Sequence, residues 1–307
     1  MRILVCGASG QVGHELVGRA SAHGLEAIGM TRGQLDITQA EQVENVVRQL
    51  KPELIINAAA YTHVDNAESN IEQAYSINRD GPAWLAEAAK QAGIPLLHIS
   101  TDYVFSGDGR APYKEADQLA PGGVYGASKL AGEAAIQASL DKHIIMRTSW
   151  VYGVHGHNFV KTMLRLGRQR DALSVVADQH GCPTQAGSIA DVLLTLASRY
   201  KREGSLAWGL YHYSGRSPCT WHDFAVEIFR QGAEKKLLEK QPKVSSITTA
   251  QYPTPARRPA WSVLDCSKFE TTFGIQTLDW RQELSVVLDA LAEAEAGQSA
   301  ATEHGKA

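Results

Sequence analysis

Residues 2–13 read RILVCGASGQVG, and this stretch joins a predicted strand to a predicted helix through three glycines. The apolar run that ends at Gly7 is typical of a buried parallel strand, and helical spacing follows in residues 13–24. Gly7, Gly10 and Gly13 form a GxxGxxG pattern between the two. In this context the glycines provide a tight turn, close approach to a pyrophosphate and close packing of the helix on the sheet. The stretch therefore predicts a dinucleotide-binding site.

The same alternation of strand and helix continues to about residue 150. Further strands are predicted at 26–30, 52–60, 95–100 and 143–149, and helices at 39–50, 82–93 and 124–140. Strands that alternate with helices indicate βαβ units, which build a parallel sheet with helices on both faces. We therefore expect an α/β chain with a Rossmann-type, doubly wound parallel sheet and a smaller C-terminal substrate-binding lobe.

The second half of the chain has a different pattern. We predict an NADP-binding Rossmann domain over 1–150, with later segments near 172–200 returning to it, and a mainly substrate-binding lobe over 151–291. Residues 292–307 are small and polar, so they are expected to form a disordered tail.

Composition excludes several classes of protein. The 307 residues carry a net charge of −3, so neither a nucleic-acid nor a membrane partner is expected. The four cysteines contain no CxxC pair, which argues against a zinc ribbon and a disulfide scaffold. The N-terminus has no signal-peptide pattern, and the expected compartment is the cytoplasm.

The end of the second predicted strand bears on the choice of nicotinamide cofactor. An acidic residue there would bind the ribose 2′-hydroxyl of NADH, whereas an arginine would accept the 2′-phosphate of NADPH. Thr31 and Arg32 follow the strand directly. We therefore predict NADPH as the cofactor, with NADH use left open, and the alternative is that Arg32 is a solvated loop residue.

Tyr125 and Lys129 lie four residues apart in GGVYGASKLAGE, on one face of a predicted helix. An ammonium beside a phenol favours the phenolate, which predicts a general acid–base pair with a lowered tyrosine pKa. The small residues between them are expected to leave room for the cofactor. With the glycine loop and STD at 100–102, the pair resembles the extended short-chain dehydrogenase/reductase family, in which Thr101 would be the third catalytic residue.

Further motifs narrow the resemblance to the dTDP-4-dehydrorhamnose reductase branch of that family. They include NAAAYTHVDNAE, STDYVFSG, SWVYG, DQHGCPT and YPTPARRPAWS, in order from residue 1 to about 291. The resemblance implies reduction of the 4-keto group of dTDP-4-dehydro-6-deoxy-L-mannose to dTDP-L-rhamnose, so a dTDP-sugar is the expected partner.

The resemblance also implies individual roles. The residues implied to hold the cofactor, besides Gly7, Arg32, Tyr125 and Lys129, are Gly10, Gln11, Val12, Asp36, Ile37, Ala60, Tyr61 and Thr62. Those implied to contact the substrate are Thr101, Asp102, Trp150, Asn158 and Arg258.

Two positions depart from the resembled pattern. Glu15 and Asp191 match part of an acidic set that binds Mg²⁺ at a homodimer contact in some members, but Ser188 and Ile189 stand where a further acid is expected. The sequence thus supports neither a complete metal site nor the metal-bridged dimer, and a homodimer stays open. Trp261 replaces an asparagine that usually follows the RP pair.

Two alternative functions stay open. The same branch includes a non-catalytic, NADP-binding regulatory subunit of methionine adenosyltransferase, although Thr101, Tyr125 and Lys129 favour an enzyme. A related sugar-nucleotide epimerase is the second alternative. A dehydratase is disfavoured because one acid, rather than two, follows Thr101.

Overall fold

The computed structural model describes the backbone of residues 1–304 and the side chains of residues 1–297. Its centre is a six-stranded, all-parallel sheet of order β10-β5-β4-β3-β1-β2. The strands are β1 (Arg2–Cys6), β2 (Glu26–Met30), β3 (Leu54–Asn57), β4 (Leu96–Thr101), β5 (His143–Thr148) and β10 (Gly209–His212). This topology confirms the predicted doubly wound α/β fold, with β10 as a strand that the sequence did not indicate.

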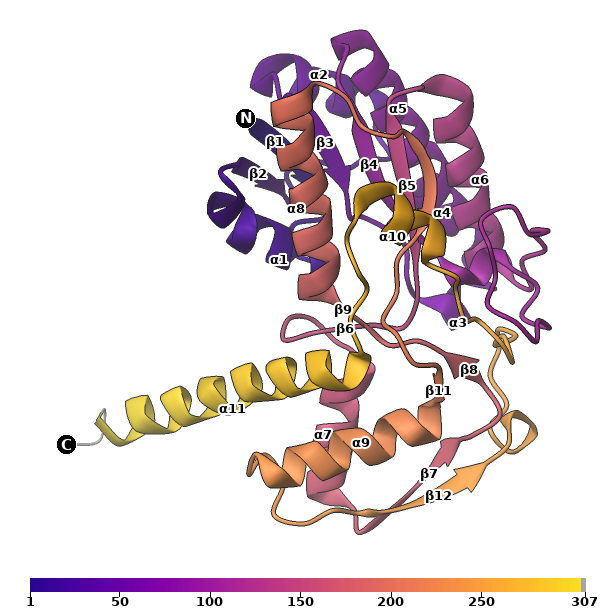
Figure 1. Cartoon of the computed structure of the whole chain (residues 1–307), viewed down its shortest axis with the longest axis vertical. Helices are drawn as coiled ribbons and strands as arrows, with labels where there is room; N and C mark the ends of the chain where they lie inside the picture. The colour runs from indigo at the N-terminus through magenta and orange to yellow at the C-terminus, as the bar shows by residue number, and fades with distance from the viewer. Residues whose placement is uncertain (305–307) are drawn as a thin grey trace.

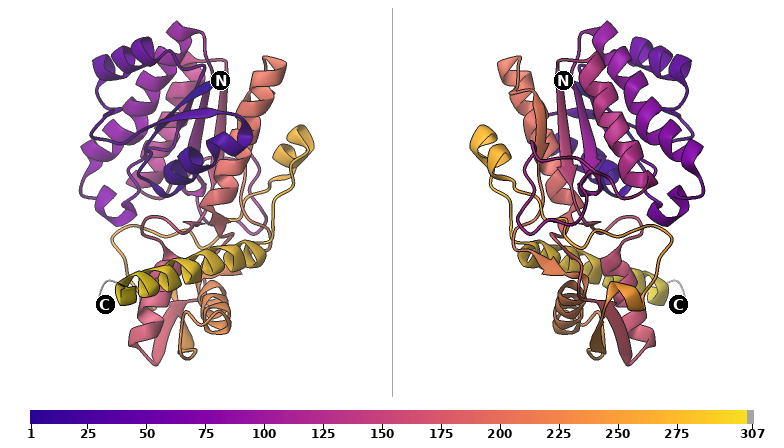
Figure 2. Two further views of the ribbon diagram at one scale, coloured as in Figure 1. Left: turned by 90° about the vertical axis from the view of Figure 1, so that its left-hand side faces the viewer. Right: turned by 90° about the vertical axis from the view of Figure 1, so that its right-hand side faces the viewer.

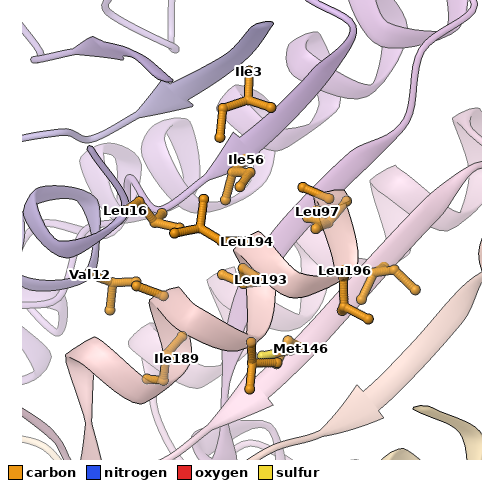
Figure 3. Packing of buried hydrophobic residues seen from close by; sticks show 14 of the residues in the cluster. Ile3, Val12, Leu16, Ile56, Leu97, Met146, Ile189, Leu193, Leu194 and Leu196 are labelled. Carbon is orange, nitrogen blue, oxygen red and sulfur yellow. The ribbon is translucent and has the colours of Figure 1, made fainter. Parts of the chain in front are cut away.

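Helices cover both faces of the sheet (Figures 1 and 2). One layer holds α1 (Gln11–Arg19), α8 (Ala186–Glu203) and α10 (Ser267–Phe273), and the other holds α2 (Ala40–Leu50), α5 (Gly81–Ala92) and α6 (Val124–Ser139). Successive strand residues point to opposite faces, so Ile3 packs under α1 and α8 whereas Leu4 packs under α2 and α5. Figure 3 shows the first of these cores, to which α1 contributes Leu16 and α8 contributes Leu193 and Leu194.

Short helices line the ends of the strands. They are η1 (Ala20–His23), α3 (Val64–Ala67), α4 (Ile71–Tyr75), the π-helical turn η2 (Ser76–Asp80) and η3 (Asp102–Val104). η3 follows β4 directly, and α3, α4 and η2 follow β3, so these turns surround the carboxyl edge of the sheet.

A second lobe lies beyond the carboxyl edge of the sheet (Figure 1). Its core packs α7 (Phe159–Gln169), α9 (Trp221–Glu234) and α11 (Trp280–His304) against the paired strands β7 (Ala172–Val176) and β12 (Lys243–Ile247). Short elements complete it: β6 (Val151–Tyr152), β8 (His180–Gly181), β9 (Thr184–Gln185), β11 (Cys219–Thr220) and η4 (Thr249–Gln251).

The second half of the chain contributes to both lobes, and one segment lies in a different lobe from the one predicted. Of the segments near 172–200 that we expected to return to the Rossmann domain, α8 does so and β7 stays in the second lobe. The predicted disordered tail at 292–307 is helical as far as His304, and residues 305–307 lie outside the described part of the chain. Within that part, no helix is long and apolar enough to cross a membrane.

Candidate active site

The glycine loop has the geometry that its sequence pattern predicts. Gly7 has φ 78°, and a Cβ there would lie 2.7 Å from the backbone nitrogen of Ala59. A Cβ on Gly13 would lie 2.0 Å from the Gly7 carbonyl oxygen, so only glycine lets α1 start this close to β1. No side chain caps the start of α1 at Gly10. N–H groups at an uncapped helix start suit a phosphate, so the loop fits a dinucleotide.

A cavity of about 530 Å³ opens beside this loop. Most of the residues predicted to hold the cofactor line it: Gly7, Gly10, Arg32, Asp36, Ile37, Ala60, Tyr61 and Thr62. His63, Asn66, Asn70 and Gln73 line it too, and the sequence did not single them out because they come from the short helices after β3.

Gln11 and Val12 do not line this cavity. The Val12 side chain is buried in the core under α8, so it can meet a cofactor only through its backbone. The Gln11 side chain accepts a hydrogen bond from Asn158 Nδ2 at 3.1 Å and thereby links the loop to the second lobe.

Arg32 and Asp36 lie together in the lining of the cavity, after the end of β2. Arg32 Nε is 3.7 Å from Asp36 Oδ2, and the Arg32 side chain is 68% exposed. Burial opposes ionisation of Asp36, but hydrogen bonds from Thr38 and the charge of Arg32 outweigh it and lower the pKa of Asp36. The guanidinium is therefore free to approach a 2′-phosphate while Asp36 is engaged with its own loop.

Thr101, Tyr125 and Lys129 meet where β4 ends against α6. Thr101 is the last residue of β4, and its hydroxyl donates to Asp102 Oδ1 at 3.0 Å. Burial raises the pKa of Tyr125 to about 12, and a hydrogen bond with the Thr101 side chain opposes this only in part. The phenol is thus protonated at neutral pH.

Lys129 does not lower the tyrosine pKa in this structure, contrary to the sequence-based prediction. Its Nζ donates to the Ile99 carbonyl at 2.6 Å and lies 3.2 Å from His98 Nε2, so both of these contacts are to β4. Burial lowers the pKa of Lys129 itself to about 8, with the charge of Glu133 opposing the change. The i,i+4 spacing placed both groups on one helix face but did not determine which group the Lys129 amine would bind.

The small residues of α6 have a packing role that also differs from the prediction. A Cβ on Gly126 would lie 2.1 Å from the Tyr103 carbonyl oxygen, and one on Gly132 would lie 2.0 Å from that of Asn78. Ser128 is buried and accepts a hydrogen bond from Asn78 Nδ2. These residues let α6 lie directly on η3 and η2, which positions Tyr125 beside Thr101.

Two buried polar groups lie beyond the triad. Asp102 Oδ2 and Arg258 Nη1 have no hydrogen bond of normal geometry among the described residues, although Ser262 and Tyr103 lie near them. Burial raises the pKa of Asp102 to about 6. Arg258 Nη2 also binds Asp65 at 2.6 Å. An unpaired acceptor and an unpaired donor fit a polar ligand such as a sugar diphosphate.

Trp150 and Asn158 are more deeply engaged with protein than their predicted substrate role suggests. Trp150 has φ 47° and stacks on Trp221, with ring centroids 3.6 Å apart. A Cβ on Gly181 would lie 2.4 Å from the Trp150 ring, so the indole is held from both sides. Asn158 caps α7 by accepting from Lys161 N–H, and its amide donates to the Gly153 carbonyl. Both residues position the second lobe against the site.

The residues that would bind Mg²⁺ do not fit a metal. Arg19 lies between them, with Nε 2.7 Å from Glu15 Oε2 and Nη1 2.8 Å from Asp191 Oδ2. No cluster of three or more metal-ligating side chains occurs among residues whose side chains are described. The Arg19 guanidinium thus occupies the space between the two acids, and the homodimer stays a prediction. Trp261 is likewise accounted for locally, because its indole N–H donates to the Ala111 carbonyl at 2.8 Å.

Comparison with known proteins agrees with this geometry. The family model described as the RmlD substrate binding domain matches residues 1–293. The chain is 46% identical to a dTDP-4-dehydrorhamnose reductase of Aggregatibacter actinomycetemcomitans, over 92% of this chain and 97% of the relative.

Two solved structures give the same result. The dTDP-4-dehydrorhamnose reductase of Clostridium acetobutylicum superposes with a TM-score of 0.88 at 40% identity, covering 95% of this chain and 99% of that one. That of Bacillus anthracis, solved in complex with NADP, superposes with a TM-score of 0.86 at 36% identity and covers 93% of this chain and 98% of that one. The chain therefore belongs to the dTDP-4-dehydrorhamnose reductase family, a branch of the extended short-chain dehydrogenases/reductases.

Proposed function

We propose that the chain reduces the 4-keto group of dTDP-4-dehydro-6-deoxy-L-mannose to dTDP-L-rhamnose with NADPH, the final step of dTDP-L-rhamnose synthesis. The observation that carries the proposal is the meeting of Thr101, Tyr125 and Lys129 at the end of β4, in the sheet whose first turn is a phosphate-binding loop. When bound, the nicotinamide would supply the hydride to C4 of the sugar.

The chain's own residues would manage the proton and the oxygen. Tyr125 would donate its proton to the developing alkoxide, since its phenol carries that proton at neutral pH. The Thr101 hydroxyl would turn from Asp102 to donate to the same oxygen and so help to polarise the carbonyl. Lys129 would turn from Ile99 and His98 to contact the nicotinamide ribose, while Asp102 and Arg258 would offer their unpaired atoms to the sugar nucleotide.

The preference for NADPH rests on Arg32. Its exposed guanidinium borders the cavity at the end of β2, and no acid stands directly after that strand. Use of NADH as a second cofactor is compatible with this geometry, because Asp36 also lines the cavity.

The test is to supply dTDP-4-dehydro-6-deoxy-L-mannose with NADPH and to follow both the absorbance of NADPH and the formation of dTDP-L-rhamnose. We expect one NADPH to be consumed for each product molecule. Binding of NADPH without consumption would overturn the proposal in favour of a regulatory subunit. An isomerised sugar without net consumption would overturn it in favour of an epimerase.

A further inference from the structure

Three buried side chains form a hydrogen-bonded chain, of which the proposed mechanism uses only Lys129. Asn57 ends β3, His98 lies opposite it on β4, and Lys129 lies on α6. Asn57 and His98 are fully buried, and Lys129 is nearly so. Asn57 Nδ2 is 3.0 Å from His98 Nδ1, and His98 Nε2 is 3.2 Å from Lys129 Nζ.

The backbone determines the direction of the first bond. The N–H of Ala59 donates to Asn57 Oδ1 at 3.0 Å. An amide nitrogen cannot accept that hydrogen bond, so Oδ1 must face Ala59 and Nδ2 must face the imidazole. Asn57 therefore donates to His98 Nδ1, which must carry a lone pair.

The tautomer of His98 then determines which group donates in the second bond. Burial, followed by the nearby charge of Lys129, lowers the pKa of His98 well below its ordinary value, so the ring is neutral. A neutral ring with a lone pair on Nδ1 carries its hydrogen on Nε2. That hydrogen points at Lys129 Nζ, which can accept it only as an uncharged amine. An N–H of the same amine donates to the Ile99 carbonyl at 2.6 Å, in the same direction along the chain.

We propose that Asn57 and His98 are positioning residues whose one-way chain of hydrogen bonds, starting at the Ala59 amide, stabilises the neutral amine of Lys129 relative to its ammonium. The inference rests on the proposed function only in assigning Lys129 to the reaction. The chain is not a proton wire, because its far end is a backbone N–H. It links Lys129 to the cofactor site, since Ala59 lines the cavity and backs Gly7.

The surrounding charges leave this chain as the main polar environment of the amine. Glu133 lies one helical turn after Lys129 and favours the ammonium, but it is held by Arg147 and Ser100. Several other charged groups on elements against α6 are paired, as in Arg79–Asp80, Asp65–Arg258 and Thr101–Asp102, and Glu68 accepts from the Val124 N–H. Tyr125 is neutral at neutral pH because burial raises its pKa.

The substitution Asn57→Asp replaces one nitrogen by oxygen, and it should reverse the direction of the hydrogen bonds. In Asn57→Asp the carboxylate accepts from both Ala59 N–H and His98 Nδ1–H. His98 Nε2 then keeps its lone pair and accepts from a Lys129 ammonium. A structural role alone would not change which ring nitrogen carries the hydrogen, so the tautomer is the deciding observable.

The experiment uses nitrogen-15 NMR of histidine-labelled full-length protein without cofactor, with His98→Leu to assign the His98 signals. We expect the Nε2–H tautomer in the wild type and the Nδ1–H tautomer in Asn57→Asp. Asn45→Asp makes the same chemical change on the exposed face of α2 and should leave the wild-type tautomer. An Nδ1–H tautomer or a charged ring in the wild type would overturn the inference.

A second measurement follows the amine directly. With ε-carbon-13 lysine, assigned by Lys129→Met, we expect Lys129 to titrate about one pH unit or more higher in Asn57→Asp than in the wild type. In the double variant Asn57→Asp/His98→Leu, only the introduced charge acts on Lys129. The rise in the Lys129 pKa, measured against His98→Leu alone, should therefore be smaller. Equal shifts in both backgrounds would refute the role of the chain. Neither readout depends on turnover, so an inactive enzyme would sink the proposed function and leave this inference standing.

Discussion

Single side chains at the end of β4 carry the chemistry that we assign to this reductase. Tyr125 is the proposed acid because its buried phenol stays protonated, while the Thr101 hydroxyl beside it can bind the same oxygen.

Tyr125→Phe should remove the proton donor and leave the ring in place. General acid catalysis contributes about 10²–10⁴-fold, so we expect kcat to fall by that factor. The dissociation constant of NADPH, measured by fluorescence titration, should stay close to that of the wild type. A variant that keeps most of its kcat would show that Tyr125 is not the acid.

Arg32→Ala should weaken NADPH more than NADH. Loss of one charge-assisted hydrogen bond to the 2′-phosphate costs about 1.5–3 kcal/mol, or roughly 10- to 150-fold in affinity. Arg32 makes no contact with the buried core, so the fold should not change. Comparison of the two dissociation constants checks this, and equal weakening of both cofactors would show that Arg32 does not recognise the phosphate.

At the scale of elements, α6 determines the geometry of the site because two of its glycines pack directly on the backbone of neighbouring turns. Gly126 and Gly132 meet the carbonyl oxygens of Tyr103 and Asn78 too closely for any Cβ. The helix can therefore bring Tyr125 to the end of β4 only while these positions are glycine.

Gly132→Ala should destabilise the protein because the new methyl group must displace the backbone of η2. Overpacking of this kind costs about 1–3 kcal/mol, despite the better helix propensity of alanine. Gly18→Ala is the matched control, since a Cβ at that helical position meets nothing within 4 Å and should stabilise by about 0.5–1 kcal/mol. Urea unfolding measures both, and a Gly132→Ala protein as stable as Gly18→Ala would contradict the packing argument.

At the scale of the whole molecule, β10 forms one edge of the sheet and places His212 against two distant parts of the chain. His212 Nδ1 lies 3.0 Å from the Tyr113 carbonyl, and its Nε2 lies 3.5 Å from Arg147 Nη1. Burial, followed by the charge of Arg147, lowers the pKa of His212 to about 3. The fold thus holds a neutral histidine that the unfolded chain would protonate below its ordinary pKa near 6.5.

This burial makes part of the stability depend on pH. Between about pH 6.5 and 3 the unfolded state binds one more proton at His212 than the folded state does, so the free energy of unfolding falls as pH falls, by at most about 1.4 kcal/mol per pH unit. Asp102 and Glu283 act in the opposite sense, because burial raises their pKa values to about 6 and 7. The contribution of His212 is therefore best measured by comparing the pH dependence of stability in the wild type and in a His212 variant.

We expect His212→Asn to lose less stability than the wild type between pH 7 and pH 5, because the amide can still donate to Tyr113 and does not titrate. Urea unfolding at both pH values gives the comparison. The control is His157→Asn, on an exposed loop, which should retain the wild-type difference. If His212→Asn and the wild type lose the same amount, His212 does not govern this pH dependence.

The sequence by itself determined the features that depend on local sterics. The strand–glycine–helix stretch at residues 2–13 predicted both the parallel sheet and the phosphate loop, since few residue types allow the turn at Gly7. The i,i+4 spacing placed Tyr125 and Lys129 on one face of α6, and the resemblance of the whole chain identified its family.

Only the tertiary structure decided the partners of these residues. Lys129 bonds to Ile99 and His98, Asn158 caps a helix in the other lobe, and Arg19 lies between the acids that resembled metal ligands. β10 is equally a product of context, because its four residues become a strand by pairing with β5. Each of these contacts joins groups that are far apart in the sequence, or buried groups that compete for the same partner. Local patterns show which groups can bond, but packing selects the bond that forms.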